Sequence, residues 1–184
     1  PWTTKTVPGF SFEPETPTTA PETVEVFGPN SEFMMMAWRF GGDATSDPIM
    51  LDLIAGIMSN GQAGLIDLDL LQDQKVLDAG ASADAQADYS EFSLSGEARE
   101  GQTLEQVRDL LLAEMEKVKQ GAFDDWLIDA VVNDNRQTRL KFYNENNSMR
   151  ASAMTNAFIL KQNWQDQVDY YDRMAKITKQ QVMD

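Results

Sequence analysis

Residues 76–98, V-L-D-A-G-A-S-A-D-A-Q-A-D-Y-S-E-F-S-L-S-G-E-A, decide how this sequence is expected to fold. The part from Val76 to Ser90 is rich in small residues, and the part from Glu91 to Ala98 alternates Phe92 and Leu94 with polar residues. Alternation with a period of two is typical of a strand with one buried face. The stretch therefore predicts two neighbouring strands, paired most simply as a hairpin.

Helices are predicted downstream of this hairpin. Thr103 to Gln106 reads Thr-Leu-Glu-Gln, which is a capping box, and apolar residues then recur three and four positions apart as far as Val118. Gly121 is expected to end this helix. Because residues 124–184 contain neither glycine nor proline, several consecutive helices should follow.

Upstream, two β-prone runs predict a second hairpin. Thr23–Phe27 and Phe33–Phe40 flank a Gly-Pro-Asn turn. The second run is apolar at nearly every position, so we expect an interior strand that is covered on both faces.

Two further helices are predicted between the hairpins. Asp47-Pro48 is a favourable helix start with Asp47 as the N-cap, and the helix that runs from there to Met58 is apolar nearly all round. Such a helix should be deeply buried. A second helical stretch is expected from Ala63 to Gln74.

The order of these elements predicts an α+β fold, with an antiparallel or mixed β-sheet and long helices packed on one face. Residues 1–23 hold five of the seven prolines and many threonines, which predicts an extended linker from a preceding domain. Residues 24–184 are then expected to form a single domain. The length is sufficient for one compact core.

Composition excludes several functions. The net charge of -15 disfavours binding to nucleic acid or to an anionic membrane, and the sequence has no apolar run long enough to span a bilayer. The chain has no cysteine and no histidine, so it has neither a thiolate nucleophile nor the commonest zinc ligand. Asp67, Asp69 and Asp73 lack the glycine and glutamate of a calcium loop, which favours a solvated helix face.

The element order and local sequence resemble the repeated domain of the insulinase or pitrilysin family of inverted-zincin metallopeptidases, which includes the mitochondrial processing peptidase. The resemblance covers roughly residues 24–184. The matching segments are Trp38–Gly42, Asp47-Pro48, Ile57–Gly61 with Gly64-Leu65, Val76–Asp88, the capped helix from Thr103, Asp125–Leu127, and Ile177-Thr178 before Val182.

The resemblance implies paired halves that close around a peptide. The catalytic half of such peptidases carries an inverted His-x-x-Glu-His motif on its first long helix, and this motif supplies two zinc ligands and the general base. The equivalent helix here, residues 49–58, contains neither histidine nor glutamate. The chain is thus expected to be a non-catalytic, structural and substrate-enclosing domain. Zinc is expected only in the catalytic domain, in the same chain or in a partner subunit.

Site residues also follow from the resemblance. Some family members direct an Arg and a Tyr, seven residues apart, at the substrate; the matching positions are Leu71 and Asp78, which cannot take over that role. Arg136, Arg139 and Tyr143 are alternative candidates for contact with the substrate. Glu114 and Glu116 lie where a catalytic half could place its third zinc ligand, and here they are expected to have surface or packing roles.

Aromatic residues near the end of the sequence allow two interpretations. Trp164, Tyr170 and Tyr171 are candidates for an interdomain contact, because exposed aromatic side chains often anchor interfaces. Packing within the core is the alternative.

Two other functions remain open from sequence alone. One is a stand-alone interaction or scaffold module that shares the fold without peptidase activity. The other is an enzyme that uses carboxylates only, such as a glycosidase, which needs two facing acids. The resemblance further implies an extracytoplasmic or periplasmic location in a bacterium.

Overall fold

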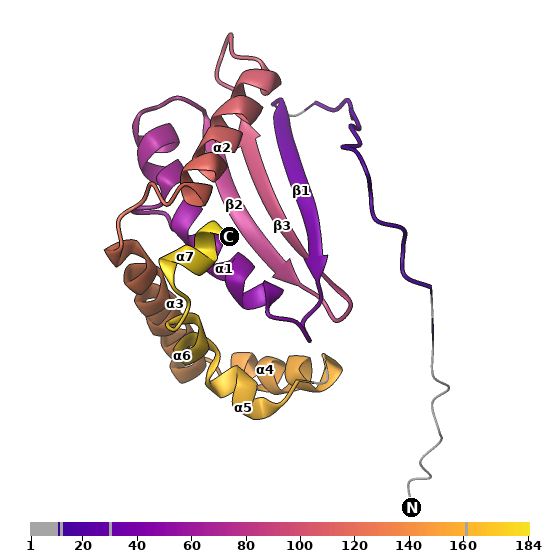
Figure 1. Ribbon diagram of the computed structural model, residues 1–184, viewed down its shortest axis with the longest axis vertical. Coiled ribbons are helices and arrows are strands. Elements are labelled where there is room, and N and C mark those ends of the chain that lie inside the picture. The colour runs from indigo at the N-terminus through magenta and orange to yellow at the C-terminus, as the bar shows by residue number, and fades with distance from the viewer. Residues whose placement is uncertain (1–10, 12, 30, 161) are drawn as a thin grey trace, which may run out of the picture. The chain divides into compact units, whose positions relative to one another are not determined.

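The computed structural model describes residue 11 and residues 13–29, 31–160 and 162–184 (Figure 1). The chain divides into two units, Pro1–Asn30 and Ser31–Asp184. In the first unit, residues 13–29 are exposed and form neither helix nor strand. The predicted linker lies outside the described residues at positions 1–10 and 12.

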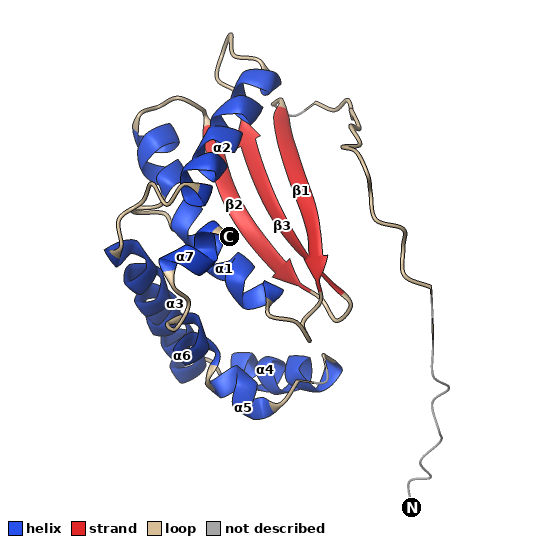
Figure 2. Ribbon diagram, viewed as in Figure 1, coloured by secondary structure: helices blue, strands red, loops and turns tan. Residues whose placement is uncertain are grey.

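The second unit contains a three-stranded antiparallel sheet with its helices on one side (Figure 2). Its strands are β1 (Phe33–Gly41), β2 (Asp78–Ala85) and β3 (Tyr89–Glu97), in the order β1-β3-β2. The predicted pairing of the two strands in residues 76–98 is therefore confirmed.

The predicted upstream hairpin is wrong. Residues 23–27 form no strand, and β1 instead pairs with β3, so that Trp38 lies opposite Phe92. A β-prone run becomes a strand only where a partner strand and a packing surface are present, and the exposed residues 23–27 have neither.

β1 is also not an interior strand covered on both faces. It is an edge strand in which half-buried Met34, Met36 and Trp38 alternate with exposed residues, among them Phe33 and Met35. The alternation of buried and exposed positions could not be recognised from the sequence because methionine and phenylalanine occupy both faces of the strand.

Seven α-helices and one short π-helix are described in the second unit. They are α1 (Asp47–Met58), the π-helix η1 (Asp67–Gln72), α2 (Leu104–Lys119), α3 (Trp126–Glu145), α4 (Asn147–Ile159), α5 (Trp164–Val168), α6 (Tyr170–Met174) and α7 (Lys179–Met183).

The helix starts agree closely with the sequence. α2 has the predicted capping box between Thr103 and Gln106. α1 begins at Asp47, but its N-cap is Ser46, and the Asp47 carboxylate instead accepts a hydrogen bond from the Gly41 amide over 2.8 Å. The N-cap prediction was therefore wrong by one residue, because this carboxylate binds the end of β1 and not an amide of its own helix.

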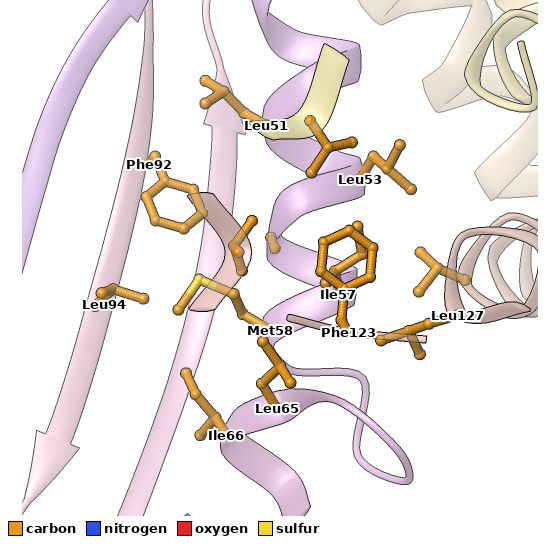
Figure 3. Close-up of a cluster of buried hydrophobic side chains, with 14 of the residues drawn as sticks. Leu51, Leu53, Ile57, Met58, Leu65, Ile66, Phe92, Leu94, Phe123 and Leu127 are labelled. Atoms are coloured by element: carbon orange, nitrogen blue, oxygen red, sulfur yellow. The ribbon is translucent and has the colours of Figure 1, made fainter. Parts of the chain in front are cut away.

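The helices lie on one face of the sheet, which confirms the α+β class (Figure 2). Phe92 and Leu94 point from β3 toward α1, where they meet a cluster that includes Leu53, Ile57 and Met58 (Figure 3). All five side chains are buried. Among the described residues, none of the helices is both long and apolar enough to cross a bilayer.

Candidate functional site

α1 is the helix that the sequence resemblance equates with the motif-bearing helix of a catalytic half. It packs against the sheet on one side and near α3 on the other, and six of its twelve residues are buried. Its only ionisable residues are Asp47 and Asp52. The helix can therefore supply neither the two imidazoles nor the general base of an inverted zinc motif.

Asp52 holds α1 to the C-terminal helices. The Tyr170 hydroxyl of α6 donates a hydrogen bond to Asp52 Oδ2 over 2.5 Å. Burial raises the pKa of Asp52, and the hydrogen bond from Tyr170 lowers it by a smaller amount. Burial also raises the pKa of Tyr170, and the neighbouring Asp52 carboxylate adds to that increase. The pair is a partly buried structural contact between distant segments.

The connection after α1 is organised by the carboxylate of Asp67. This buried side chain accepts hydrogen bonds from the backbone amides of Asn60, Gly61 and Gly64 over 2.8, 2.8 and 3.1 Å. A carboxylate that binds three amides of one turn fixes the path of the chain.

The other acidic residues considered as metal ligands are dispersed. Lys117 Nζ lies 2.7 Å from Asp69 Oδ2 and 2.9 Å from Glu114 Oε2, while Asp73 pairs with Lys75. Burial raises the pKa of Glu114, and the hydrogen bond from Lys117 opposes this. Asp67, Asp69 and Asp73 therefore have three separate sets of partners.

The predicted substrate-contact positions lie in different surroundings. Leu71 lies in the last turn of η1 and packs, partly buried, against the core. Asp78 is exposed at the start of β2, opposite Glu97 of β3. Their role as degenerate contact positions stays a prediction.

The alternative basic candidates are engaged in contacts within the domain. Arg136 pairs with Asp172 over 2.5 Å, and Arg139 donates a hydrogen bond to the Tyr143 hydroxyl over 3.1 Å. The Arg139 guanidinium also lies 5.5 Å from the ring centroid of Tyr171. The contacts with Asp172 and Tyr171 join α3 to α6, whereas the one with Tyr143 lies within α3.

The three aromatic candidates divide into two kinds. Trp164 is exposed at the start of α5. Tyr170 and Tyr171 are partly buried against the core, and their rings meet edge to face with centroids 5.3 Å apart. Of the three, Trp164 is the one that presents a large apolar surface to solvent.

The sheet face away from the helices is polar and open. On this face, the register places Arg39 of β1, Glu91 of β3 and Asp84 of β2 in one row, and Phe33, Glu97 and Asp78 in another. Between these rows, the residues of β2 and β3 are small, among them Gly80 and Ser82, whereas Met35 of β1 is 60% exposed. The face is therefore extended and acidic, with small residues on β2 and β3 and an exposed methionine on β1.

No metal site emerges in the parts of the chain that the structure describes: no three of their aspartate and glutamate side chains are grouped so as to hold an ion. The Asp52–Tyr170 and Asp67 contacts were not predicted from sequence. The signal for the first was a single acid in the middle of an apolar helix, and the signal for the second was the pair Gly61 and Gly64 just before an aspartate.

An antiparallel sheet with its helices packed on one face defines a domain of the α+β class. The family model described as the peptidase M16 inactive domain matches residues 3–135, and the chain belongs to this family. No curated protein sequence matches the chain.

Solved structures share the fold. A protease from Helicobacter pylori superposes with a TM-score of 0.75 at 14% identity over 82% of this chain and 36% of that one. The inactive peptidase domain of a candidate zinc protease from Bordetella parapertussis has a TM-score of 0.68 at 15% identity, covering 84% of each chain. A candidate zinc protease from Bordetella pertussis Tohama I has a TM-score of 0.66 at 15% identity, covering 82% of this chain and 83% of that one.

The length of the chain differs from that of one of these structures and is similar to that of the other two. It spans about a third of the length of the Helicobacter protease, and it is similar in extent to the two Bordetella structures. The matching family model describes an inactive peptidase domain, which identifies the chain as non-catalytic.

Proposed function

We propose that this chain is the structural, substrate-enclosing half of a zinc-dependent metallopeptidase whose catalytic half lies in another segment or subunit. The observation that carries the proposal is the composition of α1: the helix keeps its buried position in the fold but has no histidine or glutamate. The family match to an inactive peptidase domain supports the same interpretation.

The open face of the sheet is the surface we assign to the peptide chamber. It is extended, and the residues of β2 and β3 between its charged rows are small, so a peptide backbone could approach these two strands closely. The acidic Asp78, Asp84, Glu91 and Glu97 outnumber the basic Arg39 on this face, which favours substrates that carry positive charge near the chamber wall.

Zinc in this proposal belongs to the catalytic half, where it would polarise the peptide carbonyl and activate water. This chain contributes walls and contacts, and its own carboxylates take no part in the hydrolysis. An extracytoplasmic location forms part of the same proposal, and fractionation of the producing cells would test it.

Activity reconstitution tests the proposed function. The coding sequence around this chain, or a neighbouring subunit gene, should contain a His-x-x-Glu-His segment. We expect the catalytic half to hydrolyse peptides in a chelator-sensitive reaction, and to lose at least tenfold in kcat/KM when this chain is removed. A catalytic half that is fully active without this chain would contradict the proposal, as would the absence of any such segment.

A further inference from the structure

The helical arm, defined as residues 136–159, is unusually exposed for a folded helical segment. It comprises the second half of α3 together with α4. Of the fifteen exposed large apolar side chains described between Ser31 and Asp184, six lie in this arm. They are Leu140, Phe142, Met149, Met154, Phe158 and Ile159.

α4 has little to stabilise it within the described residues. Ala157 is its one buried residue, and its main neighbours are α3 and α5. Met154, Phe158 and Ile159 are 60%, 84% and 61% exposed. A helix of thirteen residues is marginal in water without tertiary packing. This arrangement indicates that a further surface covers α4.

The charge of the arm is opposite to that of the chain. The arm contains four basic residues and one acidic residue, Glu145, whereas the whole chain has a net charge of -15. Arg136 and Arg139 are engaged with neighbours in the domain, but Lys141 and Arg150 are exposed. A surface that combines exposed apolar groups with exposed cations matches an acidic partner that also presents apolar groups.

The position of the arm leaves it accessible to a neighbouring domain. α4 and α5 lie at the opposite end of the helical layer from α2 (Figure 1). Exposed Trp164 and Val168 of α5 extend the apolar surface beyond the arm.

The net charge of the chain indicates which kind of partner can cover this surface. An anionic membrane or a second copy of this chain would have to approach a molecule of charge -15, and the resulting repulsion opposes association. A domain held in the same assembly is brought near by its tether or by its other contacts, and so meets the local charge of the arm at short range.

We infer that the helical arm is the docking surface for an acidic, apolar-bearing face of the catalytic half. This inference rests on the proposed function and names the surface through which the two halves meet. α4 is then an element that becomes stably packed when the halves come together.

Hydrogen exchange compares α4 in this chain alone with α4 in the presence of the catalytic half, supplied as a partner subunit or as the remainder of the same polypeptide. We expect the α4 amides to exchange at least about tenfold more slowly in the assembly. Phe158→Asp should remove that protection and weaken association by about tenfold or more. Leu112→Asp, on the exposed face of α2, is the matched control and should change neither.

A charge variant provides an independent measurement. The double substitution Lys141→Glu with Arg150→Glu replaces two exposed cations, so it should leave the circular dichroism of the chain unchanged while weakening association. It should also reduce the dependence of association on salt. This variant keeps the inference testable if Phe158→Asp fails to fold.

The outcomes separate this inference from the proposed function. An active assembly in which α4 exchanges as fast as in the chain alone, and which tolerates Phe158→Asp, would overturn the docking surface and leave the proposed function standing. A catalytic half that neither binds nor needs this chain would overturn both. Protection of α4 by phosphatidylserine vesicles or by self-association, without the catalytic half, would overturn the choice of partner.

Discussion

Tyr170 donates a hydrogen bond to Asp52 across 118 positions of sequence, and so ties the C-terminal helices to the central helix of the fold. Both side chains are partly buried, and the pKa of each is raised chiefly by burial. The domain therefore uses a partly buried acid in the middle of α1 as a structural link to α6.

Removing the hydroxyl at this link should destabilise the domain. Tyr170→Phe keeps the ring and its packing but leaves the Asp52 carboxyl without its donor, so we expect a loss of about 1–2 kcal/mol in the free energy of unfolding. Urea denaturation followed by circular dichroism measures this. Tyr143→Phe removes a hydroxyl that only accepts a hydrogen bond from Arg139 of the same helix, and should cost less than about 0.5 kcal/mol. Equal costs for the two variants would argue against the link.

The raised pKa of Asp52 predicts the sign of a pH effect. The folded state binds the Asp52 proton more tightly than the unfolded state does, so this contribution to stability is full below the unfolded pKa. It is lost as the pH rises through the folded pKa. Asp52→Asn stays neutral and still offers an oxygen to Tyr170.

The Asp52→Asn variant should therefore gain stability relative to the wild-type chain as the pH rises from 4 to 7. Glu114, whose pKa burial also raises, is present in both proteins and cancels in the difference. Unfolding of the two proteins by urea at both pH values gives that difference. A difference that does not change with pH would contradict burial as the cause.

Asp67 should be the most sensitive acidic residue of the helix connection. Asp67→Ala removes the acceptor of three backbone amides in a buried turn, which should cost about 3 kcal/mol. Asp73→Ala removes only an exposed ion pair with Lys75 and should change stability by no more than about 0.5 kcal/mol. Thermal unfolding of both variants compares them, and similar midpoints would count against the assigned role of Asp67.

Replacing Gly56 by alanine should destabilise the domain, although this change usually stabilises a helix. Glycine to alanine in a helix normally stabilises by up to about 1 kcal/mol. Here a Cβ would lie 2.4 Å from Val131 Cγ1 of α3, so we expect Gly56→Ala to destabilise by about 1–3 kcal/mol.

A double-mutant cycle identifies the cause of that loss. Val131→Ala removes both γ-methyl groups and leaves only the Cβ of residue 131, 3.5 Å from the added methyl group. In this background, Gly56→Ala should cost at least about 1 kcal/mol less than it does in the wild-type chain. If the stability losses of Gly56→Ala and Val131→Ala simply add, the strain does not arise from the contact between α1 and α3.

Local patterns predicted local structure well. The hairpin of β2 and β3 and the capped start of α2 depend on residues that are close in sequence, so alternation and capping chemistry were sufficient to predict them. The lack of a zinc motif in α1 could also be read from the sequence, because the motif needs histidine and glutamate and residues 49–58 contain neither.

Long-range pairing was not predictable in the same way. The partner of β1 is β3, about fifty residues away, and a run of methionines carries no polar alternation to indicate which face is buried. The same limit applies to Tyr170, whose partner in α1 is set by how the helices pack. The arm emerged only from the structure, because exposure distinguishes its apolar residues from those of a core helix.

The central claim is that this chain cannot hydrolyse peptides by itself. The most direct measurement is the cleavage of a fluorescence-quenched peptide library by the purified chain, with added zinc and with or without a chelator. We predict no cleavage above background in either condition. Cleavage by the chain alone that disappears when the chelator is added would contradict the account.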